Sequence, residues 1–394
     1  MATIVIVPYP EPGHIDPSFK IARILQSRGH RVCYLNLADY DEYIGSRGLE
    51  FIPIFENLCP RGFVDEQAEC GVSNFEAVLS KANKASMENG YDPAAEIHSI
   101  TRSIQPDLFI IDTLLPDLAL LIQRLGIPIL LYNALLFNPW ARGDNIYSSL
   151  LKLPELILCP KEFDFPQTAD GGERHYIEPV LDLEKRDVPF AWEKLDPKKP
   201  LIYCSLGSQS HLYGWNKEFF QTAIDTMALM PDRQMVIATG LYTESDSFRN
   251  IPPNAIVVKW VPQMELLQRT SIAITHGGMN TIKSCIFFGV PIIIFPIDRE
   301  TPMNAARILY HGLGVRGNIK RNSVQHFQSL IKEIDGNPLL RLRVELMGKK
   351  LRQLEASGRG VQIIESILDQ ISRHRSGQQR LENLNQTFPI AACN

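Results

Sequence analysis

Short apolar runs alternate with amphipathic segments along this chain, and no other feature of the sequence constrains the fold as strongly. In the first half the apolar runs are rich in β-branched residues and occupy residues 3–7, 31–37, 51–55, 108–111 and 129–132. Strands that alternate with helices pair in parallel, and helices then cover both faces of the sheet. The sequence therefore predicts an α/β protein built on doubly wound parallel sheets.

A second series of apolar runs follows a stretch rich in proline, glycine and charge, residues 152–200. This series occupies residues 201–206, 234–239, 256–258, 271–275 and 291–295. A chain of 394 residues is long for a single core. We expect one domain at 1–195 that includes the linker, a second at 196–375 whose last helix spans about 360–373, and a flexible polar tail at 376–394.

The composition excludes several classes of protein. A hydrophobic content of 45% and a charged content of 21% are typical of soluble globular proteins, and a net charge of −4 provides no basic surface for nucleic acid. Seven cysteines without a C-x-x-C pair argue against a disulfide framework or a zinc site and favour a reducing, cytoplasmic compartment. No apolar stretch reaches the roughly 20 residues of a membrane-spanning helix, so we expect no integral membrane segment.

A histidine and an aspartate follow two strands that the predicted topology makes neighbours. Doubly wound sheets bind ligands at the carboxyl ends of their strands, where the strand order reverses. In the order 3-2-1-4-5, His14 follows the first strand and Asp112 follows the fourth, while Asp16 and Pro17 are expected to start the next helix. A histidine oriented by a carboxylate is a common general base. The alternative is a histidine satisfied by its own turn, with Asp112 capping a loop.

The second half contains a glycine turn between an apolar run and a helix-like segment. Residues 276–280 read His-Gly-Gly-Met-Asn. The free N–H groups and the dipole of a helix N-terminus attract anions, and glycines let a phosphate approach the backbone. The turn therefore predicts a phosphate site that uses His276, Gly278, Asn280 and Thr281, with a further hydroxyl from Ser208. Ser205 is expected to be a turn residue.

Three segments resemble the UDP-glycosyltransferase family of nucleotide-sugar-dependent enzymes. Residues 260–305 resemble its donor-binding signature, residues 8–17 its P-x-x-x-GH-x-x-P start, and residues 106–112 its PD-x-[VIL]-[VIL]-x-D segment. The resemblance implies the GT-B architecture, in which two facing Rossmann-like domains enclose an interdomain cleft. It also implies an inverting hexosyltransferase of the bacterial natural-product, macrolide type.

The resemblance assigns roles to individual residues. His14 would be the catalytic base and Asp112 its orienting carboxylate, with a UDP- or dTDP-sugar as co-substrate and with no metal or other cofactor. Trp260 would stack on the nucleotide base, Gln263 would lie near the ribose, and Glu300 would hold sugar hydroxyls. Core packing is the alternative for Trp260 and helix capping for Gln263. The expected donor-binding set is Ser208, Trp260, Val261, Gln263, His276, Gly278, Asn280, Thr281, Ser284, Glu300 and Thr301.

Two members of this set depart from the family pattern. Ser284 stands where the family usually has the glutamate that binds the ribose hydroxyls, and Thr301 stands where it has a glutamine. A shorter side chain makes fewer hydrogen bonds. The donor therefore stays open between UDP-glucose and a deoxy-sugar on dTDP, and we expect the two nucleotides to compete on comparable terms.

The acceptor is expected in the first domain, facing the cleft. Phe63, Phe75, Phe137 and Trp140 could line an apolar pocket there, although ordinary packing is the alternative for each. The partner would be a small, largely apolar molecule, and the protein a monomer or homodimer. A sugar-nucleotide epimerase of the same architecture and a non-catalytic nucleotide-sugar-binding partner protein remain open. A dehydrogenase is disfavoured because no G-x-G-x-x-G follows the first strand.

Overall fold

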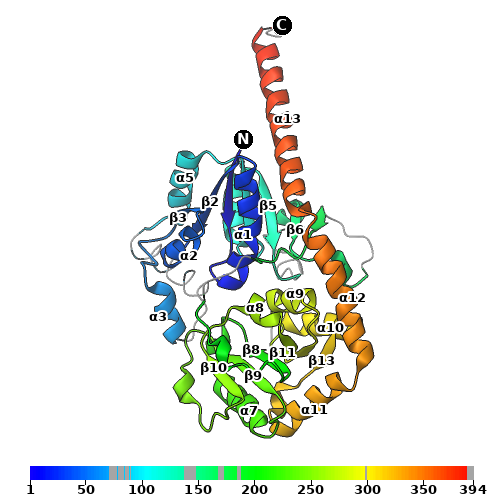
Figure 1. The fold of residues 1–394 in the computed structure, drawn as a ribbon. Coiled ribbons are helices and arrows are strands. Elements are labelled where there is room, and N and C mark those ends of the chain that lie inside the picture. Colours follow the sequence, from blue (N-terminus) through cyan, green and yellow to red (C-terminus); the bar gives the residue numbers. More distant parts are fainter. Residues whose placement is uncertain are drawn as a thin grey trace.

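The chain folds into two α/β domains stacked one on the other, each around its own parallel sheet (Figure 1). This computed structural model describes residues 1–70, 78, 84, 88, 90–136, 148–166, 173–183, 188–297 and 300–387. No helix within these ranges combines the length and the hydrophobicity that crossing a bilayer requires.

The first sheet has seven parallel strands in the order β3-β2-β1-β4-β5-β6-β7. The strands are β1 (Thr3–Val7), β2 (Arg31–Asn36), β3 (Glu50–Pro53), β4 (Leu108–Asp112), β5 (Ile129–Asn133), β6 (Glu155–Ile157) and β7 (Arg174–Tyr176). Strand β1 pairs with both β2 and β4, as the sequence predicts. Strands β6 and β7 lie in the stretch that we expected to be linker, so the first sheet is wider than predicted.

Helices cover both faces of this sheet because successive side chains of its strands point to opposite sides. Ile4 and Ile6 pack with Phe19 in one core cluster, whereas Val5 and Val7 belong to another. The helices of this domain are α1 (Pro12–Ser27), α2 (Asp41–Gly45), α3 (Phe63–Cys70), α5 (Pro93–Ile104) and α6 (Pro116–Arg124).

Helix α1 begins earlier than the sequence predicts. Pro12 occupies its first turn and Glu11 is the extended N-cap, so Asp16 and Pro17 lie inside the helix instead of starting it. Proline is readily accepted in a first turn, where no N–H partner is needed, and its fixed φ suits the helix. His14 therefore lies on the first helical turn instead of in the preceding loop.

The second sheet has six parallel strands in the order β10-β9-β8-β11-β12-β13. The strands are β8 (Leu201–Ser205), β9 (Gln234–Ala238), β10 (Ala255–Val258), β11 (Thr270–Thr275), β12 (Ile292–Ile294) and β13 (Gly314–Arg316). The helices that follow are α7 (Asn216–Ala228), α8 (Gln263–Leu267), α9 (Met279–Phe287), α10 (Thr301–His311), α11 (Val324–Asp335) and α12 (Pro338–Glu355). Both the parallel pairing and the helices on either side match the expected second doubly wound unit.

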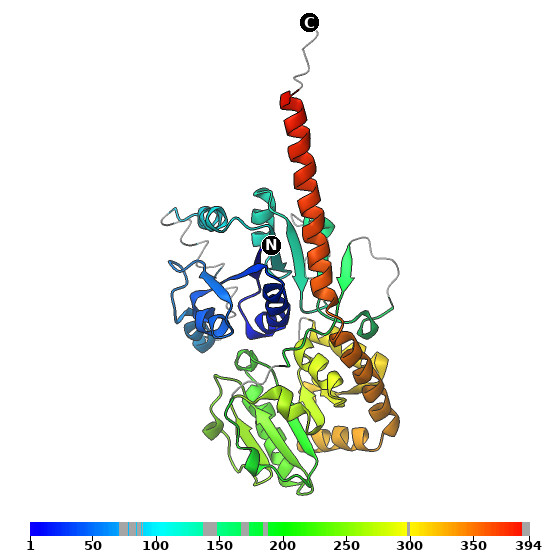
Figure 2. The same cartoon turned by 45° about the horizontal axis from the view of Figure 1, so that its top comes forward.

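The last helix, α13 (Arg359–Thr387), returns to the first domain (Figure 2). Val361, Ile364 and Leu368 are buried in the same core cluster as Phe19 of α1. The segment at 360–373 was expected in the second domain, whereas its apolar face packs on the first. The polar residues from Ser376 onward continue the helix to Thr387, because helix-forming residues such as Gln, Arg, Leu and Glu predominate there, and the flexibility expected of the tail stays a prediction.

The two domains also share a tightly packed contact beside the cleft. Ile157 and Phe163 of the first domain belong to the core cluster of the second. The Arg307 guanidinium, on α10, pairs with the buried Asp164 carboxylate at 2.8 Å. Lys283 of α9 donates to the Leu158 carbonyl oxygen at 2.9 Å. These contacts fix how the two domains face each other.

Candidate active site between the domains

The first turn of α1 brings His14 against the carboxyl end of β4. Its Nδ1 lies 2.7 Å from Oδ2 of Asp112, and both side chains are buried. Strands β1 and β4 are neighbours, so the residues that follow them meet at one edge of the sheet. The predicted juxtaposition of imidazole and carboxylate is therefore confirmed.

Backbone groups and a tyrosine hold this pair in place. The Leu114 amide donates to Oδ1 of Asp112 at 2.9 Å and the Tyr9 amide to Oδ2 at 3.3 Å. The Tyr132 hydroxyl donates to the carbonyl oxygen of His14 at 2.6 Å. A neutral imidazole that donates from Nδ1 to a carboxylate keeps Nε2 as a proton acceptor.

The pKa of His14 is raised above its usual value. Burial alone would lower it, because burial disfavours the imidazolium, but the Asp112 carboxylate and, more weakly, Glu11 and Glu300 outweigh that effect. Glu300 belongs to the second domain. The histidine therefore senses charge from both sides of the cleft.

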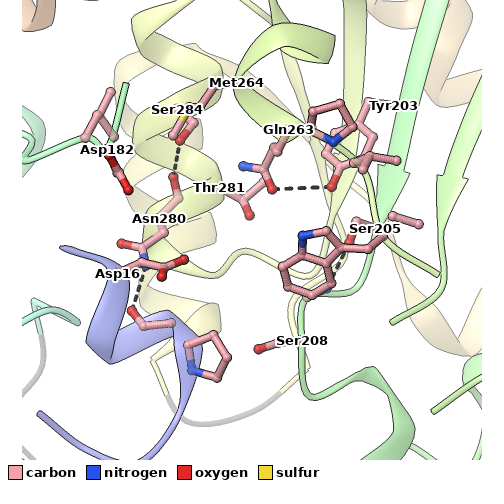
Figure 3. A pocket seen from close by; sticks show the side chains of 18 of the residues that line it. Asp16, Asp182, Tyr203, Ser205, Ser208, Gln263, Met264, Asn280, Thr281 and Ser284 are labelled. Atoms are coloured by element: carbon pink, nitrogen blue, oxygen red, sulfur yellow. Dashed lines mark hydrogen bonds between the residues drawn. The ribbon is translucent and has the colours of Figure 1, made fainter. Parts of the chain in front are cut away.

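A pocket opens between the domains beside this turn of α1 (Figure 3). The first domain contributes Pro12, Gly13, Asp16, Pro17, Val180, Leu181 and Asp182 to its wall. The second domain contributes the ends of β8 and β9, residues 259–265, and the first turns of α9. The pocket thus joins the neighbourhood of His14 to the predicted phosphate site.

Seven of the eleven expected donor residues line this pocket. They are Ser208, Trp260, Val261, Gln263, Asn280, Thr281 and Ser284. Gln263 accepts a hydrogen bond at 3.3 Å from the hydroxyl of Tyr203, a further pocket residue on β8 (Figure 3). Ser205 accepts from the Gly207 amide at 3.1 Å, which fits the expected turn role, although it also lines the pocket.

The glycine turn before α9 has a structural requirement of its own. Gly277 has a φ of +101°, and a Cβ at this position would lie 2.6 Å from Cδ1 of Ile294. Within the described residues no side chain caps the start of α9 at Gly278. The first amides of α9 therefore remain available beside the pocket, as an anion site requires.

His276, expected at the phosphate site, is enclosed by the turns around it. Its ring fits between Gly207 and Gly278, where an added Cβ would lie 2.6 and 2.9 Å from its Cε1. Burial lowers its pKa to about 4, so the imidazole is neutral at pH 7. In the described part of the chain its Nδ1 has no hydrogen-bond partner, and neither His276 nor Gly278 is among the pocket-lining residues.

The side chains at the two positions that depart from the family pattern both form hydrogen bonds within the protein. The Ser284 hydroxyl lines the pocket and donates to the Asn280 carbonyl oxygen at 2.8 Å. Thr301 is 3% exposed, and its hydroxyl accepts a hydrogen bond from the Ile297 amide at 2.9 Å. Neither Glu300 nor Thr301 is among the described residues that line the pocket, so their contact with a donor stays a prediction.

The acceptor prediction is wrong for Phe63. Its side chain is 1% exposed and packs in the core of the first domain, because α3 turns this residue inward. Phe75, Phe137 and Trp140 lie outside the described residues. No three His, Cys, Asp or Glu side chains gather as a possible metal site anywhere in the described ranges.

Several residues of the pocket wall were not predicted from the sequence. Asp16 and Asp182 bring carboxylates to it (Figure 3). Val180 has a φ of +53°, which is rare for a β-branched residue and often marks a functional or strained position. Residues 180–182 lie in the stretch read as linker, and only the three-dimensional path of the chain brings them to the cleft.

Known proteins are similar to this chain in sequence. Residues 220–346 match the family described as UDP-glucoronosyl and UDP-glucosyl transferase. The NDP-glycosyltransferase YjiC of Bacillus subtilis (strain 168) is 22% identical over 394 residues, which cover 93% of this chain and 97% of the relative. The similarity thus extends over both domains.

Solved structures share the two-domain arrangement. The glycotransferase of kitacinnamycin superposes with a TM-score of 0.72 at 22% identity, covering 93% of this chain and 98% of that one. The spinosyn rhamnosyltransferase SpnG complexed with thymidine diphosphate superposes with a TM-score of 0.71 at 18% identity, covering 93% and 100%. The chain is a glycosyltransferase of the two-domain GT-B fold, and its residues 220–346 match the UDP-glucoronosyl and UDP-glucosyl transferase family.

Proposed function

We propose that this enzyme transfers a hexose or deoxyhexose from a UDP- or dTDP-sugar to a hydroxyl of a small, largely apolar natural product. The anomeric configuration inverts, and neither a metal ion nor another cofactor takes part. YjiC is an NDP-glycosyltransferase and SpnG a rhamnosyltransferase with thymidine diphosphate bound, which supports this class of donor. The main support is that one turn of α1 contains both the oriented His14 and the pocket wall at Gly13.

In the proposed reaction His14 is the general base. Its Nε2 takes the proton of the acceptor hydroxyl while the hydroxyl oxygen forms a bond to the anomeric carbon. The bond between that carbon and the diphosphate oxygen breaks, and its electron pair leaves with the diphosphate. The entering and leaving oxygens occupy opposite faces, so the configuration inverts. Asp112 keeps the required tautomer and stabilises the imidazolium that forms.

The departing diphosphate needs positive or hydrogen-bonding groups at the other end of the pocket. The open N-terminus of α9 supplies backbone N–H groups and the positive end of the helix dipole. The hydroxyls of Ser208 and Thr281 line the same region and can donate to phosphate oxygens. A protein treated with a chelator should therefore retain its rate.

A transfer assay tests this function. The enzyme is incubated with UDP- and dTDP-sugars and a panel of phenols and alcohols, and mass spectrometry follows the gain of one sugar residue. His14→Ala should lower kcat by roughly 10³-fold or more while nucleotide binding persists. Unchanged turnover in this variant would remove His14 from the mechanism. Nucleotide binding without any transfer by the wild-type enzyme would favour the non-catalytic alternative.

The donor preference has a test of its own. The Ser284 hydroxyl is occupied by the Asn280 carbonyl, and no carboxylate stands at this position to bind ribose hydroxyls. We expect kcat/KM values for UDP and dTDP donors of the same sugar to lie within roughly tenfold of each other, and Ser284→Glu to shift the ratio towards UDP. A wild-type preference for UDP donors of more than roughly 100-fold would contradict this.

A further inference from the structure

A carbonyl group of α1 accepts a hydrogen bond from the other domain. Pro17 lies four residues after Gly13, where a helical residue would normally donate its N–H to the Gly13 carbonyl. Proline has no N–H to donate. The Gly13 oxygen instead accepts from Nδ2 of Asn280 at 2.6 Å, across the domain interface (Figure 3).

One end of this hydrogen bond lies beside the proposed general base, and the other lies at the predicted phosphate site. Gly13 immediately precedes His14, whose own carbonyl is held by Tyr132 and whose ring is held by Asp112. Asn280 is the second residue of α9, whose N-terminus is the predicted phosphate site. The bond therefore joins the turn that contains the base to the helix that faces the donor.

We propose that Asn280 is a positioning residue that sets the separation between His14 and the start of α9 through the Gly13 carbonyl. Pro17 makes this possible because it leaves the carbonyl without its usual helical donor. The inference rests on the proposed function, since the separation matters only if His14 and the donor react with one another. It assigns Asn280 a role other than the phosphate contact expected from the sequence.

The two roles predict different kinetics. A phosphate ligand contributes to affinity, so its loss should raise the Kd for a nucleoside diphosphate. A positioning residue contributes to the alignment of acceptor oxygen, base and anomeric carbon, so its loss should lower kcat. The roles also differ in their dependence on Pro17, because only the positioning role acts through the Gly13 carbonyl.

The experiment compares Asn280→Ala, Pro17→Ala and the double variant. Asn280→Ala should lower kcat by roughly tenfold or more while the Kd for UDP and dTDP changes by less than about twofold. Pro17→Ala supplies an N–H that competes for the Gly13 oxygen and should lower kcat by a smaller factor, roughly threefold. The double variant should be no slower than Asn280→Ala. The proposal would be overturned if the two reductions in kcat multiplied in the double variant, or if Asn280→Ala lowered only the affinity for the nucleotide.

Two controls match these substitutions. Pro338→Ala changes a proline in the first turn of α12, and Asn322→Ala removes an amide after the short helix at residues 319–321; both should leave kcat unchanged. Hydrogen exchange of backbone amides measures the interdomain link without enzyme turnover. The exchange rate of the amides in residues 276–284 should rise in Asn280→Ala and in Pro17→Ala. Wild-type enzyme without transferase activity would defeat the proposed function alone, whereas unchanged exchange in both variants would defeat the interdomain link.

Discussion

At the scale of single residues, the strand order determines which side chains of the site meet, and the packing determines how deeply each is buried. His14 and Asp112 could be paired from the sequence because neighbouring parallel strands end at the same edge. The same rule brings Gly207 and His276 together, because they follow the neighbouring strands β8 and β11. It does not predict the burial of the His276 ring, which depends on how closely Gly207 and Gly278 pack against it and which lowers its pKa to about 4.

The raised pKa of His14 predicts the pH dependence of the reaction. The base works unprotonated, so kcat/KM should rise with pH through a pKa above the ordinary value of 6.5. Asp112→Asn removes the main group that raises this pKa, because burial then dominates and favours the neutral ring. The rising limb should therefore move to lower pH, while the plateau falls by roughly 10²-fold or more.

Initial rates between pH 5 and 9 measure both quantities. Glu50→Gln is a suitable control, since that carboxylate pairs with Arg31 at the surface, away from the cleft. If kcat/KM of Asp112→Asn rose over the same pH range as that of the wild-type enzyme, the titrating group would not be His14.

At the scale of helices and strands, a strand was predicted where it lies in a clear apolar run, as the three residues of β12 do in the run 291–295, and was missed where it does not. Strands β8, β9 and β11 have five or six residues and were recognised as apolar runs. Strands β6, β7 and β13 also have three residues each and were missed, and β6 and β7 lie among prolines and charges. The start of α1 was misplaced because two prolines in one segment offer two possible first turns.

The turn between β11 and α9 should tolerate no side chain at Gly277. Alanine there would adopt a positive φ and meet the Ile294 side chain, which should destabilise the fold by about 2–4 kcal/mol. Urea unfolding measures the loss. Gly214→Ala is the matched control, because a Cβ at Gly214 meets nothing within 4 Å. Equal midpoints for the two variants would show that the turn relaxes freely.

At the scale of the whole molecule, α13 makes the first domain depend on the end of the chain. Ile364 is fully buried among residues of that domain. Truncating it to alanine should cost roughly 2–5 kcal/mol, because the cavity forms in the core of the first domain. Gln370→Ala on the exposed side of the same helix should be neutral within about 0.5 kcal/mol. Equal thermal stability of both variants would mean that α13 contributes little to the core.

The return of α13 has a practical consequence for engineering. The second domain is one continuous segment between residues 196 and 358, while the first domain is formed by the segment before it and by α13. A chimera that borrows a donor lobe from a relative therefore needs two junctions, so that the recipient keeps its own terminal helix. A single junction near residue 195 would place the relative's terminal helix against the first domain of the recipient, whose core is shaped to pack the apolar side chains of its own α13.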